Sequence, residues 1–228
     1  MVNSLTEQIR KTSLDLITRR LDGEIFQPIN PFTIEDLSFD YAQINPKYHV
    51  SENSDDEVIL YKGAKRGYEQ EGLLSMALNG GLANHVVEVK AIIEQGNDEL
   101  IRELFDQHTS YYSYTALLSA TFNPEQAQVF APTHPLARKR QDETIYQIRI
   151  KANRCVVDCY DTGNCGPNKE VLILGTIFPE EISAVKLIND DKHSELIKTW
   201  NGVLLIQRHP DKNSTNRDVK NPNNWIHL

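Results

Sequence analysis

Residues 117–131 read LLSATFNPEQAQVFA, and this stretch predicts a buried strand, a tight turn and a short helix. Apolar residues lead into Ser119 and Thr121, whose hydroxyls are two positions apart and therefore on one face of a strand. Asn123 is a favoured N-cap, and Pro124 suits the first helical position. The stretch thus predicts a strand that ends in two hydroxyls and leads directly into a capped helix.

Two interpretations of this stretch are open. The paired hydroxyls can form a cradle for a ligand at the end of the strand. Alternatively, they can satisfy nearby backbone groups beside an amphipathic helix whose Ala127, Phe130 and Ala131 face inward. The stretch alone favours the second interpretation, because such hydroxyls commonly bond to local backbone groups. Other segments of the chain change this balance.

Composition limits the class of protein. The chain has 228 residues, 39% hydrophobic and 25% charged, which fits one soluble globular domain of moderate size, with or without an appendage. A net charge of −8 argues against nucleic acid as the main partner, since binding to phosphates needs a basic surface. No apolar run approaches the roughly 20 residues of a membrane span. The N-terminus lacks a basic leader followed by an apolar block, so we expect synthesis in the cytoplasm without a Sec-type signal.

The three cysteines are Cys155, Cys159 and Cys165. An odd number in a chain without a signal peptide favours reduced thiols. Their spacing does not match the short Cys-x-x-Cys pairs of structural zinc sites. We therefore predict ordinary structural cysteines and no metal site.

Residues 1–57 are predicted to form an N-terminal helix and a connector. Residues 5–21 have the apolar periodicity of an amphipathic helix, and Gly23 is a natural stop. Residues 24–50 are rich in proline and asparagine, which indicates an extended connector packed on the surface. An acidic loop at 51–57 then leads into the main domain.

The main domain begins with an apolar strand pattern that we expect to stop at Gly63, in a basic loop. Lys62, Lys65 and Arg66 provide the positive charge. A cation beside a glycine at the end of a strand can meet a phosphate. Such charges are, however, more often part of a solvated turn.

Predicted helices cluster in the first half of the chain and predicted strands in the second. We expect helices at 71–78, 86–95, 98–107 and 193–200, strands at 144–150, 155–160, 170–174, 183–188 and 203–207, a turn at 175–177, and a polar tail at 209–224. This arrangement predicts an α+β fold with a strongly bent antiparallel core and helices against it.

Three short motifs occur in order between residues 58 and 188. They are Leu60-Tyr61-Lys62-Gly63, Ser119-Ala120-Thr121, and Glu170-Val171 followed by Gly175-Thr176-Ile177. In this order they resemble the Tyr-Arg, Ser-Thr-Ser and Glu-x-Glu-Val motifs of the ADP-ribosyltransferase toxins, most closely the A chains of the cholera and heat-labile enterotoxin group. The resemblance implies a catalytic domain at 58–190, with a C-terminal extension at 191–228.

The resemblance also implies roles for single residues. Glu170 and Ser119 would be catalytic, and Asn168 would face the acceptor. Residues expected to contact NAD, which is the substrate in this family, are Lys62, Tyr61, Gly63, His85 and Thr121. His85 is included because the toxin group has a histidine between its first two motifs.

Two positions depart from the family pattern. Lys62 stands where the family has arginine, and lysine cannot make the same bidentate contacts to a phosphate. Asn168 stands where arginine-modifying members have the first glutamate of their pair. These departures put arginine specificity in question and leave Glu170 available.

The function implied is an NAD-dependent mono-ADP-ribosyltransferase that modifies a protein. Since the chain shows no signal peptide and no cysteine-bridged linker to a binding subunit, we expect an effector that acts on a protein of a host cell. Two alternatives stay open. One is an inactive protein-binding module with the same fold, and the other is an NAD glycohydrolase in which water replaces the protein acceptor.

Overall fold

A computed structural model describes residues 28–65, 72–109, 115–130, 143–160, 169–187 and 225–228. Several predictions fall outside these ranges. They concern the helices at 5–21 and 193–200, the strand at 203–207, Cys165 and Asn168. In the part of the chain that is described, no helix is both long and apolar enough to cross a membrane.

The described residues contain a seven-stranded sheet in the order β5-β6-β3-β1-β4-β8-β9, in which every pair is antiparallel. Its strands are β1 (Glu57–Lys65), β3 (Leu117–Thr121), β4 (Glu143–Lys151), β5 (Cys155–Val157), β6 (Glu170–Leu174), β8 (Ile182–Leu187) and β9 (Ile226–His227). A second pairing joins β2 (Leu73–Leu74) to β7 (Thr176–Ile177).

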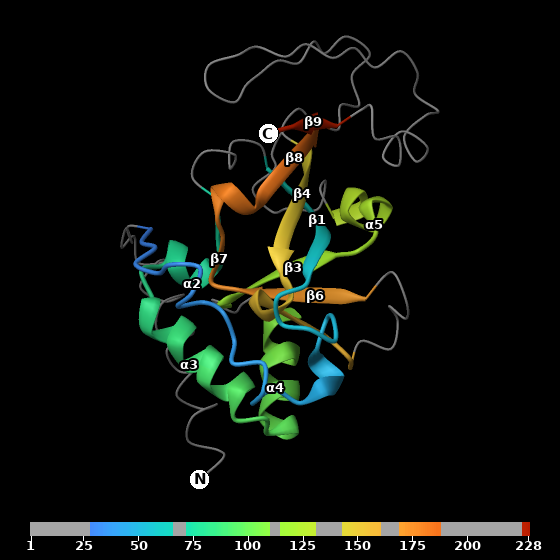
Figure 1. The fold of residues 1–228 in the computed structure, drawn as a ribbon. Coiled ribbons are helices and arrows are strands. Elements are labelled where there is room, and N and C mark those ends of the chain that lie inside the picture. The colour runs from blue at the N-terminus through green and yellow to red at the C-terminus, as the bar shows by residue number, and fades with distance from the viewer. Residues whose placement is uncertain (1–27, 66–71, 110–114, 131–142, 161–168, 188–224) are drawn as a thin grey trace.

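The sheet bends sharply between β1 and β3. β1 pairs with β4 through nine residues, from Glu57 to Lys65, but meets β3 at a single pair, Tyr61 with Thr121. In Figure 1, β1, β4 and β8 accordingly run at a steep angle to β3 and β6. The predicted bent antiparallel core is present, and the bend falls at the junction of the first two motif strands.

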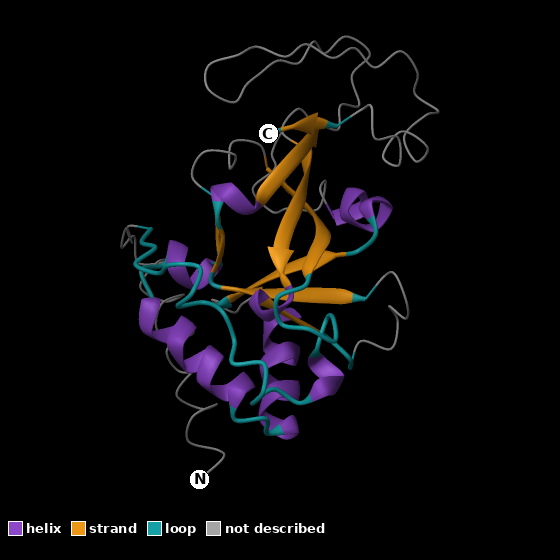
Figure 2. Ribbon diagram, in the orientation of Figure 1, coloured by secondary structure: helices purple, strands orange, loops and turns teal. Residues whose placement is uncertain are grey.

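Helices flank this sheet on two sides, as Figure 2 shows. α2 (Met76–Asn79), α3 (Ala83–Glu94) and α4 (Asp98–Thr109) gather at one end of the molecule, and α5 (Pro124–Phe130) lies apart from them beside β1. Three single 3₁₀ turns, η1 (Pro46–Tyr48), η4 (Ala152–Arg154) and η6 (Pro179–Glu181), complete the described helical elements. The α+β class is therefore confirmed, and the α-helices in the described part of the chain all lie within its first 130 residues.

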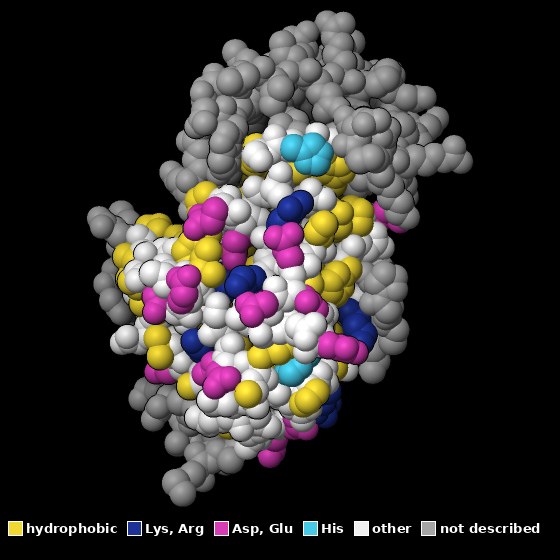
Figure 3. Space-filling view, in the orientation of Figure 1, with side chains coloured by type: hydrophobic (Ala, Val, Ile, Leu, Met, Phe, Trp, Pro, Cys, Tyr) yellow, Lys and Arg dark blue, Asp and Glu magenta, His cyan; other side chains and the backbone are white. Residues whose placement is uncertain are grey.

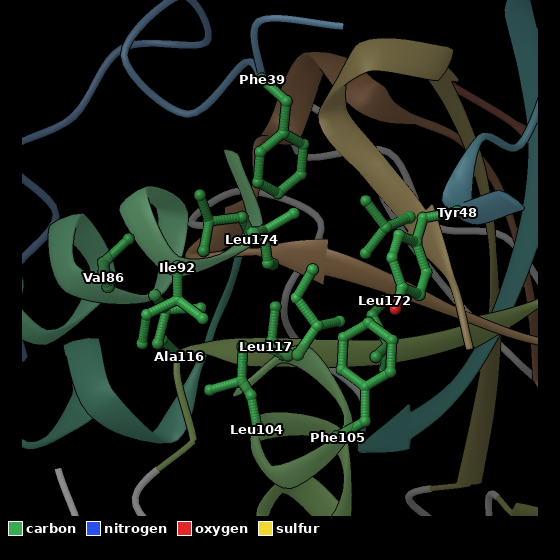
Figure 4. Close-up of a cluster of buried hydrophobic side chains, with 14 of the residues drawn as sticks. Phe39, Tyr48, Val86, Ile92, Leu104, Phe105, Ala116, Leu117, Leu172 and Leu174 are labelled. Atoms are coloured by element: carbon green, nitrogen blue, oxygen red, sulfur yellow. The ribbon is translucent and has the colours of Figure 1, made fainter. Parts of the chain in front are cut away.

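Two hydrophobic clusters lie on opposite faces of β3 and β6. The first, drawn in Figure 4, joins α3 and α4 to alternate residues of these strands, among them Leu117, Leu172 and Leu174. The second packs the opposite residues, such as Leu118 and Ile173, against β1 and β4. The alternation of a strand explains this division, because neighbouring side chains point to opposite faces.

The segment before β1 is more than a surface connector. Leu37, Phe39, Ile44 and Tyr48 are all at most 3% exposed and belong to the first cluster. The prediction of a connector packed on the surface was therefore wrong for residues 37–48. Proline and asparagine mark irregular backbone, but they do not show how deeply the apolar residues between them are buried.

Local pairing corrects three further predictions. β1 continues through Gly63 to Lys65 because β4 pairs with it along its whole length, so no turn begins at Gly63. Only Gly175 turns at 175–177, with φ +70°, and β7 follows it at once. The predicted helix at 71–78 is instead β2 followed by the single turn α2.

The opening stretch folds as predicted as far as Phe130; Ala131 and the predicted inward position of Phe130 lie outside what the structure describes. β3 leads through Asn123 into α5, and Asn123 Oδ1 accepts a hydrogen bond from the backbone N–H of Glu125 at 3.0 Å. This bond satisfies one of the free N–H groups in the first turn of the helix. Ala127 is 1% exposed, in agreement with its predicted inward position.

Candidate functional site

The three motifs meet on adjacent strands. Lys62 lies on β1, Ser119 on β3 and Glu170 at the start of β6, and these strands are neighbours in the sheet. The Nζ atom of Lys62 donates a hydrogen bond to the backbone carbonyl of Ser119 at 2.7 Å. This bond crosses the bend between β1 and β3. The fold thus brings together one predicted residue from each motif.

A histidine that the sequence analysis did not select completes this group. His108, near the end of α4, has Nε2 at 2.7 Å from Oγ of Ser119 and at 3.6 Å from Oε1 of Glu170. Its other ring nitrogen, Nδ1, lies 2.7 Å from Oγ1 of Thr115. That hydroxyl also accepts the backbone N–H of Leu117 at 3.0 Å. The imidazole is therefore fixed at both nitrogens.

We call Lys62, His108, Ser119 and Glu170 the site cluster. The side chain of Glu170 is 19% exposed and that of His108 is 8% exposed, so the carboxylate stays accessible while the imidazole is nearly enclosed. Burial by itself raises the pKa of Glu170, but His108, Ser119 and the charge of Lys62 together outweigh it and lower that pKa below its ordinary value. Glu170 is thus ionised at neutral pH.

For Lys62, by contrast, the surroundings disfavour the charged form. Burial disfavours its ammonium form and lowers its pKa to about 8, while the charge of Glu170 acts weakly against this change. The lysine remains mostly protonated at neutral pH, and it loses its charge as the pH rises through about 8. An arginine at this position would stay charged at any such pH.

Two of the remaining residues predicted on β1 and β3, Tyr61 and Thr121, lie in register with Glu170. Thr121 pairs with Glu170 on one side and with Tyr61 on the other, and directly paired residues share a face of the sheet. Thr121 is buried, and its Oγ1 accepts the backbone N–H of Asn123 at 3.1 Å, which fits a structural role in the turn. Gly63 is opposite Ile145 within the β1–β4 pairing.

His85 is not part of the site cluster. It lies on α3, is 5% exposed, and has Nδ1 at 3.6 Å from Oε2 of Glu88. The next residue, Val86, packs beside Gly175, which is five residues along the chain from Glu170 and thus roughly 15 Å away. Burial lowers the pKa of His85 and keeps it neutral. His108 also lies between the first two motifs in the sequence, and it is His108 rather than His85 that contacts Ser119 and Glu170.

The sequence did contain a signal for His108. Leu104 and Phe105 face the core from α4, and His108 follows them at spacings of four and three residues, so it continues the same face of the helix. A polar residue on that face points toward the sheet. Its partner could not be derived, because the contact with Ser119 depends on how α4 packs against β3.

The surface charges, the possible metal ligands and the thiols of the described residues add little to what the site cluster indicates about the kind of site. Figure 3 shows acidic and basic side chains interspersed on the visible face, without a broad basic area among the residues coloured there. Within the described ranges, no group of three or more histidine, cysteine, aspartate or glutamate side chains is arranged to hold a metal ion. Cys155 and Cys159 are free thiols, and burial raises the pKa of Cys155 to about 12.

Comparisons of the chain with models of protein families and with curated proteins find no match. The basis for inferring a reaction is therefore the set of functional groups in the site cluster. It offers an ionised, partly exposed carboxylate, a hydroxyl held by an imidazole, and a cation on the neighbouring strand. Such a set can stabilise positive charge that develops next to Glu170, and it can hold a ligand that carries phosphate near Lys62.

Proposed function

We propose that this protein is an NAD-dependent mono-ADP-ribosyltransferase that modifies a protein. One observation carries the proposal. Lys62, Ser119 and Glu170, each selected from a separate motif, come together on three adjacent strands, and Glu170 is held as a carboxylate there. Successive members of this group are separated by about 50 residues in the sequence, so they are not close merely because they are neighbours along the chain.

The reaction breaks the bond between C1′ of ribose and the ring nitrogen of nicotinamide. The electron pair of that bond leaves with nicotinamide, which needs no proton because its nitrogen was formally positive. Positive charge then develops on the ribose, as in glycoside cleavage. Glu170 is suited to stabilise this charge, since a fixed charge aimed at a developing charge is often the largest catalytic contribution. A nucleophile of the acceptor protein forms the new bond to C1′ and releases its proton to the surrounding water.

The other members of the site cluster support Glu170. Ser119 lies between His108 and Glu170 and would orient the carboxylate or the ribose hydroxyls. Lys62 would meet the diphosphate as a point charge, which requires it to be protonated. His108 would hold Ser119 through Nε2, with Thr115 fixing the opposite side of the ring.

The decisive experiment measures two products from NAD. One assay follows transfer of labelled ADP-ribose into proteins of a eukaryotic cell lysate, and the other follows release of nicotinamide in buffer. We expect labelled proteins with the wild type and loss of labelling by at least about 100-fold with Glu170→Gln. Glu180→Gln, which changes an exposed carboxylate of η6, is the matched control and should behave like the wild type.

The same two assays separate the alternatives. Release of nicotinamide that depends on Glu170 but labels no protein would favour an NAD glycohydrolase. If the wild type neither releases nicotinamide nor labels any protein, the enzymatic proposal is wrong. An inactive module that has the same fold and binds proteins would then be the better explanation.

A further inference from the structure

The C-terminus returns to the sheet that carries the site cluster. β9 pairs with β8, and the backbone N–H of Leu228 donates to the carbonyl of Ser183 at 3.0 Å. Trp225, the residue before β9, places its ring centroid 5.5 Å from that of Tyr61. Tyr61 precedes Lys62 on β1, so the two side chains leave the strand on opposite faces, and Tyr61 is on the face of the row that contains Glu170. The last described segment of the chain therefore contributes an aromatic side chain beside the first motif.

Tyr61 has a defined position relative to Glu170. Glu170 pairs with Thr121, and Thr121 pairs with Tyr61, so the three residues form one row across neighbouring strands. Adjacent strands are about 4.8 Å apart, which puts the backbones of Glu170 and Tyr61 roughly 10 Å from each other. An extended dinucleotide whose ribose lies at Glu170 is long enough to reach the Tyr61 side chain.

The two rings of the aromatic pair do not stack on each other. The planes of Tyr61 and Trp225 are tilted by 51°, and both side chains are only partly buried. By contrast, the rings of Tyr41 and His49 stack at 3.8 Å and 15°, so each covers a face of the other. Ala127 packs against the Tyr61–Trp225 pair from α5 and supports it.

A polar group accompanies the pair. Nε2 of Gln147 donates a hydrogen bond to the Tyr61 hydroxyl at 3.3 Å, while Oε1 of Gln147 accepts from Ser183 at 3.3 Å. Because the Tyr61 oxygen accepts from Gln147, its own proton is directed elsewhere and can be donated to a ligand. Flat rings for packing and a directed hydroxyl donor are together suited to a planar nitrogen heterocycle.

We propose that Tyr61 and Trp225 form a subsite for the heteroaromatic base of a nucleotide. This inference rests on the proposed function, because NAD cleavage at Glu170 is what places the ribose next to this row. Adenine and nicotinamide are the two bases that NAD can offer, and both share the planar ring that the pair recognises. The C-terminal strand is then part of the NAD site.

Tryptophan fluorescence tests the subsite directly. The chain contains two tryptophans, Trp200 and Trp225, so Trp200→Phe leaves Trp225 as the single reporter. This variant is titrated with NAD, AMP, nicotinamide and ribose 5-phosphate. We expect quenching by NAD and no quenching by ribose 5-phosphate, which lacks a base. Quenching by AMP alone identifies adenine as the bound base, and quenching by nicotinamide alone identifies nicotinamide.

Variants then measure the contribution of each ring. Tyr61→Leu in the same background should weaken NAD binding by about tenfold to a hundredfold, because stacking on an aromatic ring is lost. In separate calorimetric titrations, Trp225→Leu should have a similar effect and Trp225→Phe should retain most of the affinity. Tyr41→Leu, which changes the stacked pair elsewhere, should leave NAD affinity unchanged.

The outcomes distinguish this inference from the proposed function. Quenching by NAD without nicotinamide release would support the subsite and reject the enzyme. Nicotinamide release that depends on Glu170, combined with no quenching and with unchanged KM in Trp225→Leu, would reject the subsite and keep the enzyme. Absence of both signals would reject both.

Discussion

Two of the places where described residues bring a cation and a glutamate close together differ in how completely the charges are satisfied. Arg154 is fully buried, donates from Nε to Glu181 at 3.1 Å, and uses its other nitrogens on the carbonyls of Leu37 and Thr176. In the site cluster, the cation Lys62 instead bonds to a neutral carbonyl. The first pair is closed to a ligand, whereas the second leaves a carboxylate partly exposed.

The two glutamates also respond differently to their surroundings. Burial raises the pKa of Glu181 and outweighs the opposing effect of Arg154. For Glu170, the neighbouring His108, Ser119 and Lys62 outweigh burial and lower its pKa. Arg154 and Glu181 therefore fix the segments around them, whereas the site cluster keeps Glu170 charged and accessible.

The largest loss of stability is expected at the buried pair of Arg154 and Glu181. Glu181→Gln leaves Arg154 buried without its counter-charge, so we expect a loss of about 3–5 kcal/mol in the free energy of unfolding. Glu170→Gln should change it by less than about 1 kcal/mol, since Glu170 is partly exposed and no fully buried charge is left behind. Urea unfolding of both variants beside the wild type gives the measurement. Equal losses in the two variants would mean that Glu170 is also a structural residue.

A smaller effect is expected at His108, which we regard as a positioning residue for Ser119 and Glu170. His108→Ala should reduce nicotinamide release by up to about 100-fold, because Ser119 loses its partner. His108→Gln places an amide, which can donate or accept a hydrogen bond, near the position of Nε2 and should restore much of the activity. A different result would be that His108→Gln fails to restore activity and that its pH–rate profile lacks the alkaline or acidic limb of the wild type. In that case the imidazole is required for proton transfer.

The next effect concerns the charge on Lys62. Its pKa of about 8 means that the cation is lost as the pH rises through that value, so binding of ADP-ribose should weaken by about tenfold between pH 7 and pH 9. Lys62→Arg remains charged and should bind with little change over the same range. Calorimetric titration at both pH values measures this contrast. A wild type whose affinity is independent of pH would show that Lys62 does not contact the diphosphate.

Local patterns in the sequence were sufficient for the central elements of the fold. β3, β6 and α4 each have a full run of residues with the period of a strand or a helix, and all three were predicted. β2, β7 and β9 contain two residues each, which is too short for any periodicity to be visible. Their pairing is determined by tertiary contacts, and for that reason it was missed.

The candidate site was predicted only in part, because motifs indicate some of its residues and tertiary contacts determine the others. Lys62, Ser119 and Glu170 belong to motifs that a chain can be searched for, and the structure places them together. His108 and Trp225 belong to no motif. Their contacts with the motif residues form only when α4 and the C-terminal segment pack beside these strands. Histidine is common in structural positions, so His85 and His108 could not be ranked before their partners were known.

The smallest effect we predict is on stability at alkaline pH. The folded-state pKa of Lys62 lies below its ordinary value, so between about pH 8 and 10.5 the unfolded chain binds more protons than the folded one. Stability contributed by this group therefore rises with pH across that window. Because Lys62 is only partly buried, we expect about 1 kcal/mol. Subtracting the unfolding free energy of Lys62→Met at each pH removes the titration of the other groups. A difference that stays constant from pH 7 to 10.5 would show that Lys62 is solvated as fully as an exposed lysine, and the contrast with Arg154 would then rest on geometry alone.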